Sequence, residues 1–195
     1  MHRDVDKIVQ AANSDAVRAL ILAPPTIYGT GRGPVNRRSQ QLPGLARFTL
    51  EKGYAPIVGA GKTEWDNVHI ADLGPLFVAA ADATQNPVQA SNPEIFGKRA
   101  YYFARGGVHV WADLSRGVAE AAYRKGYLPA PLTKPVKGSE ISDVSWGNNS
   151  KGVPGRAEKY FGWKPTHPSI EELLGAAVDV EADSLELVPH EKPKA

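Results

Sequence analysis

The alternation of apolar and polar residues divides this chain into helical and strand-like segments that follow one another in turn. Residues 4–13 carry four apolar side chains at helical spacing, which predicts an amphipathic helix. Residues 17–23 are almost continuously apolar and end at a pair of prolines, which predicts a strand buried on both faces. A helix followed by such a strand is typical of an α/β fold with parallel strands. We therefore predict this fold class.

The remainder of the chain predicts shorter elements separated by loops. We expect helices over residues 43–52, 73–83 and 111–125, strands over 67–70 and 100–104, and loops over 26–37 and 85–98. Residues 141–146 favour an edge strand, a short helix ends at Gly162, and a Ser-x-x-Glu pattern at Ser169 opens the last helix. Gly53 suits the C-cap of its helix, and Asp72 suits the N-cap of the helix that follows it.

The composition is that of a folded domain. The chain has 195 residues, 42% of them hydrophobic and 23% charged, which is enough to bury a core without covalent crosslinks. It contains no cysteine, which excludes disulfides, thiolate nucleophiles and cysteine-ligated zinc and agrees with a reducing compartment. The 19 glycines and 16 prolines lie between the periodic segments, so they indicate turns in a loop-rich fold.

Charge and hydropathy argue against two classes of partner. The formal net charge is +2 and the longest basic cluster is Arg37-Arg38, so we expect no binding to nucleic acid. No uninterrupted apolar run approaches the ~20 residues that a membrane helix needs. The residues that follow Met1 lack the apolar core of a secretory signal. We therefore expect a cytoplasmic protein with neither a membrane nor a nucleic acid as partner.

The loop after the apolar run is the first candidate site. In open α/β sheets, ligands bind outside the carboxyl ends of the strands, and residues 24–33 occupy that position. Glycines here would let the backbone approach a ligand, and Arg32 and Arg37 could hold an anionic group. The alternative is a turn with two solvated arginines. The glycines lack the G-x-G-x-x-G spacing, and Pro34 lies where that motif's helix would begin, so this is no dinucleotide fingerprint.

Other titratable residues give weaker indications. His69 lies three residues before Asp72 at a strand-to-helix junction, so it suits a general base or, more simply, a structural hydrogen bond. Tyr160 and Lys164 have the Tyr-x-x-x-Lys spacing of an oxidoreductase pair, but Gly162 breaks the helix that would hold both on one face. The remaining histidines lack metal-ligand spacing, so we predict no metal site.

Three segments, in this order and at these separations, resemble the motifs of a known family. They are Pro25-Thr26-Ile27-Tyr28-Gly29, residues 65–73 (WDNVHIADL) and residues 161–165 (FGWKP). Together they resemble the carboxyl half of the extended short-chain dehydrogenase/reductase family, which includes the NAD(P)-dependent epimerases and dehydratases. The resemblance covers roughly residues 4–183.

The resemblance implies a fold and a division of the chain. Residues 1–35 would be the trailing helix and strand of a partial Rossmann-type fold. Residues 36–183 would mostly form the smaller mixed α/β substrate-binding lobe, with segments that pack back on the nucleotide-binding domain. Residues 184–195 would be a loose tail.

The resemblance also implies roles for individual residues. The backbone of Pro25, Thr26 and Ile27 would face the nicotinamide of NAD or NADP, while Tyr28, Arg32 and Arg37 would line the substrate side. Lys7 is a candidate for the family's catalytic lysine, although Arg3 and not a tyrosine lies four residues before it. Trp65 stands where the sugar-nucleotide epimerases carry an arginine that contacts a diphosphate. This departure implies a less anionic substrate, such as a small carbonyl or hydroxyl compound.

We therefore expect the substrate-binding portion of an NAD(P)-dependent epimerase, dehydratase or reductase. The family's glycine fingerprint and Tyr-x-x-x-Lys helix are not found within these 195 residues, so we expect the isolated chain to be inactive. The alternative is a non-catalytic remnant that binds a small molecule or a partner subunit. A weaker third hypothesis is a standalone hydrolase or transferase that uses His69. The apolar run 17–23 would need cover, from a second copy of the chain or from an upstream half of the fold.

Overall fold

Short, mostly parallel strand pairs form the framework of the structure, a computed structural model that describes residues 3–141 and 143–190. The first sheet pairs β1 (Ile21–Ala23) with β5 (Tyr101–Phe103), and the second pairs β3 (Ala55–Val58) with β7 (Thr133–Val136). In the third, β4 (Glu64–His69) lies between the parallel β2 (Thr26–Tyr28) and the antiparallel β6 (Gly107–Val110). The predicted α/β class with parallel strands is confirmed.

Helices pack around these sheets. They are α1 (Arg3–Ala11), α2 (Gln41–Lys52), α3 (Ile70–Gln85), α4 (Pro87–Ala90), α5 (Trp111–Arg124), α6 (Arg156–Phe161) and α7 (Leu174–Ser184). Short 3-10 turns cover Gly138–Glu140 (η1), Val144–Gly147 (η2) and Glu171–Leu173 (η3). No helix in the described part of the chain combines the length and the apolar character needed to cross a membrane.

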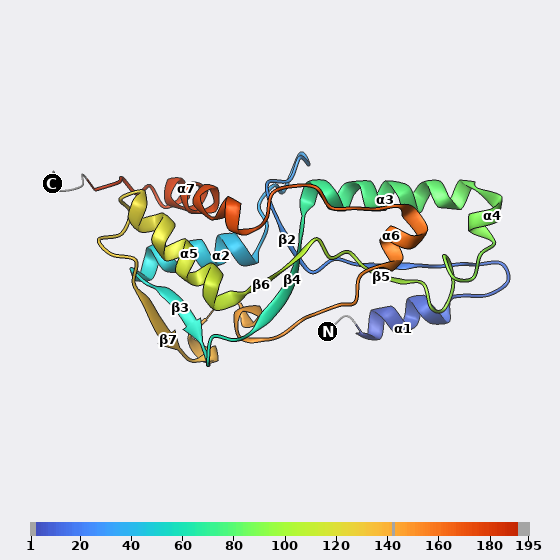
Figure 1. Ribbon diagram of the computed structural model, residues 1–195, viewed down its shortest axis with the longest axis horizontal. Coiled ribbons are helices and arrows are strands. Elements are labelled where there is room, and N and C mark those ends of the chain that lie inside the picture. Colours follow the sequence, from blue (N-terminus) through green and yellow to red (C-terminus); the bar gives the residue numbers. More distant parts are fainter. Residues whose placement is uncertain (1–2, 142, 191–195) are drawn as a thin grey trace.

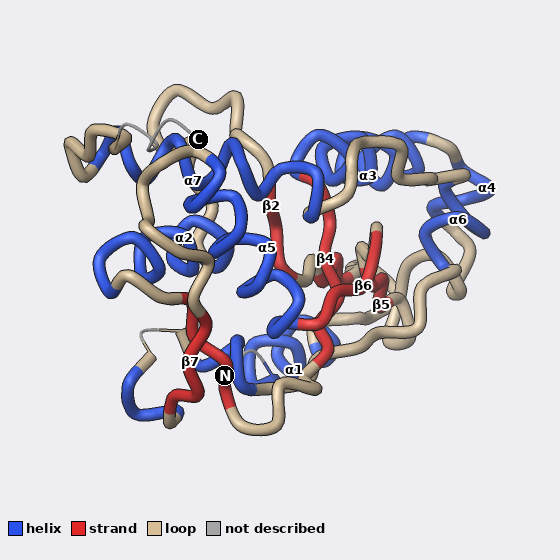
Figure 2. The backbone as a smooth tube through the Cα atoms, turned by 60° about the vertical axis from the view of Figure 1, so that its left-hand side comes forward, coloured by secondary structure: helices blue, strands red, loops and turns tan. Residues whose placement is uncertain are grey.

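The molecule is elongated, with the three-stranded sheet β2-β4-β6 in the middle (Figure 1). On one side of this sheet, α2, α5 and α7 lie over the β3-β7 pair, and their apolar side chains form one core. On the other side, α3 and α6 lie above the β1-β5 pair and share a second core that includes Tyr102 and Trp163. Figure 2 shows the strands as separate short groups among the helices. The middle sheet therefore joins two separately packed lobes.

Two glycine caps form as the sequence predicts. Gly53 follows α2 with a φ of 74° and donates its backbone N–H to the carbonyl of Thr49. Gly162 ends α6 with a φ of 63°. Both values are in the left-handed region that glycine adopts without steric cost, so these residues terminate their helices.

The prediction of a strand over residues 17–23, buried on both faces, is wrong in length and in burial. The strand β1 includes only Ile21–Ala23, which are half-buried, and Val17 is 51% exposed. The turn after α1 is the physical reason. The Asn13 side chain accepts the backbone N–H of Ala19, and Ser14 exchanges hydrogen bonds with Val17. These bonds hold the preceding backbone in the turn, so pairing with β5 begins only at Ile21.

Several loop predictions also need correction. The predicted loop 26–37 opens with β2, and the predicted loop 85–98 contains α4, which Asn86 caps through two side-chain hydrogen bonds. The predicted edge strand over 141–146 is wrong. Asp143 accepts the backbone N–H of Ser145 at 2.9 Å and turns the chain into η2, while Ser142 lies outside the described residues. The strand that forms in this part of the chain is β7.

The end of the chain packs in part against α5. The helix α7 ends at Ser184, and the backbone N–H of His190 donates to the carbonyl of Gly126 at 2.9 Å. Residues 191–195 of the predicted tail lie outside the described residues.

Candidate functional site

A groove of about 750 Å³ lies beyond the carboxyl ends of β2 and β4. These parallel strands end side by side at Tyr28 and His69, and the glycine-rich loop follows β2 directly. The loop forms one wall of the groove, and α2, η3 and α7 form the other. The lining residues are Gly29, Thr30, Gly31, Arg32, Arg37, Arg38, Ser39, Leu42, Pro43, His69, Leu173, Ala176, Ala177 and Val180. The structure therefore brings the predicted Arg32 and Arg37 together at one cavity.

One backbone and one side-chain hydrogen bond close the arginine-bearing loop on itself. The N–H of Gly31 donates to the carbonyl of Arg37 at 2.9 Å, and Arg37 Nε donates to the carbonyl of Gly33 at 3.0 Å. Arg32 and Arg37 are both exposed, and neither forms an ion pair within residues 3–141 and 143–190. Their charges are thus presented to the groove without neutralisation.

A third arginine, Arg38, lines the groove, and the sequence pattern does not predict it as a site residue. Its Nε donates to Glu181 Oε1 at 2.6 Å, and Arg47 Nη1 lies 3.6 Å from the other oxygen of this carboxylate. The Glu181 side chain is only 1% exposed, whereas those of the two arginines are 45% and 40% exposed. The side-chain hydrogen bond to Glu181 raises the pKa of Arg38. This pairing ties the loop to α7 and compensates the charge of Arg38.

Gly29 lets the loop pass directly over the ring of His69. Its φ is +86°, and a Cβ built at this position would lie 2.4 Å from His69 Nε2. Both the backbone conformation and the close approach require glycine. Gly29 therefore fixes the path of the loop at the start of the groove.

His69 is the N-cap of α3, the role predicted from the sequence for Asp72. His69 Nδ1 accepts the backbone N–H of Ala71 at 3.2 Å, so the helix begins at Ile70. Asp72 instead accepts from the backbone of Thr166 and His167, at 2.9 and 3.1 Å, and lies 2.7 Å from His167 Nδ1. The prediction of Asp72 as the cap is wrong because the histidine that ends β4 reaches the free N–H groups first.

These residues form one hydrogen-bonded and stacked cluster. The rings of His69 and His167 stack at 4.7 Å with an angle of 5° between them. Burial and the neighbouring His167 lower the pKa of His69, against an opposing effect of Asp72. Burial would raise the pKa of Asp72, but its hydrogen bonds from His167 and Thr166 outweigh burial, and the pKa is lowered. The ionised Asp72 carboxylate thus accepts hydrogen bonds from Thr166 and His167 and fixes the segment that precedes α7.

The nitrogen and oxygen atoms of His69, Asp72 and His167 lie within 4.8 Å of one another, the spacing of a metal site. Their bonding argues for a structural cluster. The Nδ1 atoms of both rings and the oxygens of the carboxylate are already engaged in hydrogen bonds. His69 uses its Nδ1 lone pair to accept the Ala71 N–H, so its neutral ring carries the proton on Nε2 and offers no free lone pair to a metal.

Tyr28 lies behind the groove rather than in its lining. It is 4% exposed, its hydroxyl donates to the carbonyl of Pro168 at 2.8 Å, and its ring contacts His69 edge-on. Burial, together with the nearby Asp72, raises the pKa of Tyr28 to about 12. Tyr28 is therefore a neutral phenol whose ring packs against His69.

The residues predicted to face a cofactor lie next to the groove. Pro25 and Ile27 line a second cavity of about 380 Å³, which shares Gly29, Gly31 and Arg37 with the groove. Thr26 is fully buried, and its hydroxyl has no hydrogen-bond partner among the residues of the described ranges. The two cavities thus meet along one stretch of the loop.

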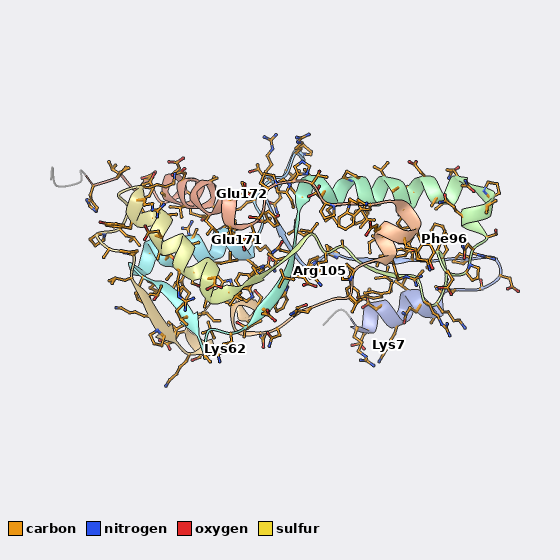
Figure 3. All side chains as sticks on the ribbon, in the orientation of Figure 1. Lys7, Lys62, Phe96, Arg105, Glu171 and Glu172 are labelled. Atoms are coloured by element: carbon orange, nitrogen blue, oxygen red, sulfur yellow. The ribbon has the colours of Figure 1, made fainter. Side chains whose placement is uncertain are left out.

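Lys7 and Trp65 lie away from the groove. Lys7 is on α1, 3.8 Å from Asp4, and its side chain is 62% exposed (Figure 3). Trp65, on β4, lines a separate cavity of about 550 Å³ with Asp66 and Arg105. Glu171 and Glu172 belong to η3, which contributes Leu173 to the groove lining, and Figure 3 shows them far from Lys7. The structure does not bring Lys7 to the predicted substrate residues.

Sequence comparison relates this chain to one family. Residues 2–95 match the model of the NAD dependent epimerase/dehydratase family. The oxidase ucsJ of Acremonium sp is 33% identical over 189 residues, covering 92% of this chain and 54% of that protein. The chain thus spans about half the length of this relative.

Solved structures share the fold over the same extent. UDP-glucuronic acid 4-epimerase from Bacillus cereus, in complex with UDP-glucuronic acid and NAD, is 17% identical with a TM-score of 0.60, covering 93% of this chain and 50% of that one. The dTDP-glucose 4,6-dehydratase DesIV from Streptomyces venezuelae, with NAD and TYD bound, is 16% identical with a TM-score of 0.60, covering 92% and 48%. RMD from Pseudomonas aeruginosa, complexed with NADPH, is 14% identical with a TM-score of 0.55, covering 92% and 53%.

These findings confirm the partial Rossmann-type fold and the family resemblance expected from the sequence motifs. Residues 2–95 of this chain match the NAD dependent epimerase/dehydratase family model, and the chain as a whole has about half of the fold of the epimerases and dehydratases that it resembles.

Proposed function

We propose that this chain is the substrate-binding portion of an NAD(P)-dependent epimerase, dehydratase or reductase that acts on a small carbonyl or hydroxyl compound. The groove of about 750 Å³ at the ends of β2 and β4 carries the proposal. It lies where ligands bind in open α/β sheets, and its volume is typical of small-molecule sites. Arg32 and Arg37 line it and supply positive charge that no acidic side chain of the described residues pairs with.

In this proposal the second cavity receives the nicotinamide of NAD or NADP. The backbone at Pro25, Thr26 and Ile27 would face the ring, and Thr26 would act through its backbone because its side chain is fully buried. The rim shared by the two cavities supports this assignment, since hydride transfer requires cofactor and substrate in direct contact. Tyr28 would not contact the substrate; its ring would hold the ring of His69 in position in the groove wall.

We propose that hydride transfer requires a further part of the family fold, so that the 195 residues alone bind substrate without turnover. The open side of β1 supports this, because β1 pairs only with β5 among the described strands. The further part, or a second copy of the chain, would cover that edge. We propose a cytoplasmic location, with which the absence of cysteine from these 195 residues agrees.

The alternative is a non-catalytic protein that binds a small molecule or a partner subunit. The same open edge of β1 favours it, since a partner subunit could pair there. The two functions differ in whether the reading frame upstream of residue 1 encodes a βαβ unit with a glycine fingerprint and a Tyr-x-x-x-Lys helix.

The test compares this chain with a longer polypeptide that includes the upstream reading frame. NADH and NADPH are titrated by fluorescence, and turnover with a panel of small ketones, aldehydes and alcohols is followed by nicotinamide absorbance. We expect low-micromolar cofactor binding and turnover only for the longer polypeptide. Tight cofactor binding by the 195 residues alone would contradict the proposal, and an upstream frame without those motifs would favour the non-catalytic alternative.

A groove variant separates substrate binding from cofactor binding. Ala176 is exposed on α7 and lines the groove, so Ala176→Trp fills it. In the longer polypeptide, we expect this change to abolish turnover and to leave NADPH binding unchanged. The matched control is Ala81→Trp, at an exposed position on α3 that lines none of the cavities described above.

A further inference from the structure

The two walls of the groove differ in chemistry. The wall formed by α2, η3 and α7 consists only of apolar side chains, namely Leu42, Pro43, Leu173, Ala176, Ala177 and Val180. Val180 is 54% exposed, so this wall is open to a ligand. The opposite wall is the loop, with its three arginines and His69. A ligand that fills the groove therefore contacts hydrocarbon on one side and guanidinium groups on the other.

The uncompensated charge on the loop wall belongs to two of its arginines. Arg38 is paired with the buried carboxylate of Glu181 at 2.6 Å, whereas Arg32 and Arg37 have no acidic partner within the described ranges. Within residues 3–141 and 143–190, no aspartate or glutamate lines the groove. Arg37 uses only its Nε for the Gly33 carbonyl, so its terminal nitrogens remain available to an anion.

Neutral polar side chains are scarce in the lining. Thr30 and Ser39 are the described lining residues of this kind, and no amide side chain and no aromatic side chain other than His69 lines the groove in the described part of the chain. A sugar requires hydrogen-bonding side chains around its ring, whereas the lining side chains of α2, η3 and α7 are all apolar. This apolar wall favours a hydrocarbon group over a glycosyl group.

We propose that the groove takes an amphipathic acid, a molecule with an apolar body and one carboxylate, in preference to a nucleotide sugar. The apolar body would lie against α2 and α7, and the carboxylate would pair with Arg37 and Arg32 at the rim. This inference rests on the proposed function and names the substrate class of the same groove. The carbonyl or hydroxyl that reacts would lie on the apolar body, toward the rim shared with the second cavity.

The test measures binding of three probes to the 195-residue chain by isothermal titration calorimetry. Decanoate has both the tail and the charge, decanol has the tail alone, and UDP has anionic and nucleoside groups without the tail. We expect decanoate to bind at least tenfold more tightly than either of the others. Arg37→Gln and Arg32→Gln should each weaken decanoate about tenfold, the effect of one charge-assisted hydrogen bond, and leave decanol unchanged.

Matched variants control for general loss of charge and of folding. Arg99→Gln removes an exposed arginine of the other lobe that forms no ion pair in the described part of the chain, and it should bind decanoate like the parent chain. Ala176→Trp should abolish decanoate binding, while Ala81→Trp should not. Circular dichroism of each variant verifies that the fold is retained.

The outcomes distinguish this inference from the proposed function. If UDP binds more tightly than decanoate and Ala176→Trp abolishes its binding, the groove is a ligand site but the amphipathic class is wrong. Equal affinities for decanoate and decanol would also overturn the inference. If Ala176→Trp changes the affinity of none of the probes, the groove is not the binding site, and the proposed function fails with it.

Discussion

His109 is a buried histidine of β6 in the middle sheet, two residues before the start of α5. It is 3% exposed, its Nδ1 lies 2.9 Å from Asn67 Nδ2, and its ring contacts Trp111 edge-on at 4.4 Å. Its Nε2 has no hydrogen-bond partner among the residues that the structure describes. Burial lowers the pKa of His109 to about 4. The folded protein therefore holds this ring neutral at a pH where the unfolded chain would protonate it.

This shift predicts that stability falls with acidification. An unfolded histidine binds its proton near pH 6.5, so the contribution of His109 is complete above that pH and is lost as the pH falls toward 4. We expect a loss of about 2 kcal/mol between pH 7 and pH 5, measured by urea unfolding. His109→Gln should remove most of this dependence, and His190→Gln, at an exposed site, should retain it. Equal pH dependence in all three proteins would contradict the assignment.

Gly29 permits a second test at the scale of single residues. Its positive φ and the ring of His69 both oppose a side chain, so Gly29→Ala should destabilise the chain by about 2 kcal/mol in urea unfolding. The matched control is Gly33→Ala in the same loop, where a Cβ would meet its nearest neighbour at 4.0 Å. The double variant Gly29→Ala with His69→Ala should recover part of the loss, since only the backbone strain remains. If Gly29→Ala is as stable as Gly33→Ala, the loop does not depend on this contact.

At the scale of elements, Glu181 joins α7 to the loop and to α2. Removing Arg38 would leave a carboxylate that is 1% exposed with only Arg47, at 3.6 Å. Arg38 is itself half exposed, so its contribution is partly screened, and we expect Arg38→Gln to cost about 1–2 kcal/mol. The double variant Arg38→Gln with Glu181→Gln should lose less than the sum of the single variants. Additive losses in urea unfolding would show that the two side chains act independently.

Local patterns predicted the helices better than the short strands. The helices α2 and α6 end where Gly53 and Gly162 permit a left-handed residue, which is a local property of the chain. The strand β7 contains Pro135 and has no apolar alternation, and it exists because its backbone pairs with β3, far away in sequence. Such a strand depends on a distant partner, so its own residues do not reveal it.

The same distinction applies to the groove. Arg32 and Arg37 could be predicted because they follow a strand in a glycine-rich loop, the usual position of a ligand site. The wall formed by α2, η3 and α7 could not be predicted, because α7 reaches the groove only through tertiary packing. One signal was present in the sequence, since Glu181 lies on the same helical stripe as Leu174 and Val178, at a spacing of seven and three residues. A carboxylate on a buried stripe indicates a cationic partner from another element.

At the scale of the whole molecule, β1 has one open edge. Ile21 donates its N–H to the carbonyl of Ala100, and Ala23 accepts from Ala104. Successive residues of a strand direct their backbone groups to opposite sides, so the N–H of Leu22 points away from β5. Because β1 pairs only with β5 among the described strands, the Leu22 amide should exchange rapidly with solvent deuterium in the 195-residue chain.

The proposed further part of the family fold would pair with this edge. In the longer polypeptide we expect the exchange of the Leu22 amide, followed by NMR, to slow by about tenfold or more, since protection follows the free energy of local opening. The Ala119 amide lies inside α5, in a fully buried region, and serves as the control because its protection should change far less. If Leu22 is already protected in the 195-residue chain at high dilution, then β1 is covered without further sequence. Protection that increases with protein concentration would instead show that a second copy of the chain pairs at this edge.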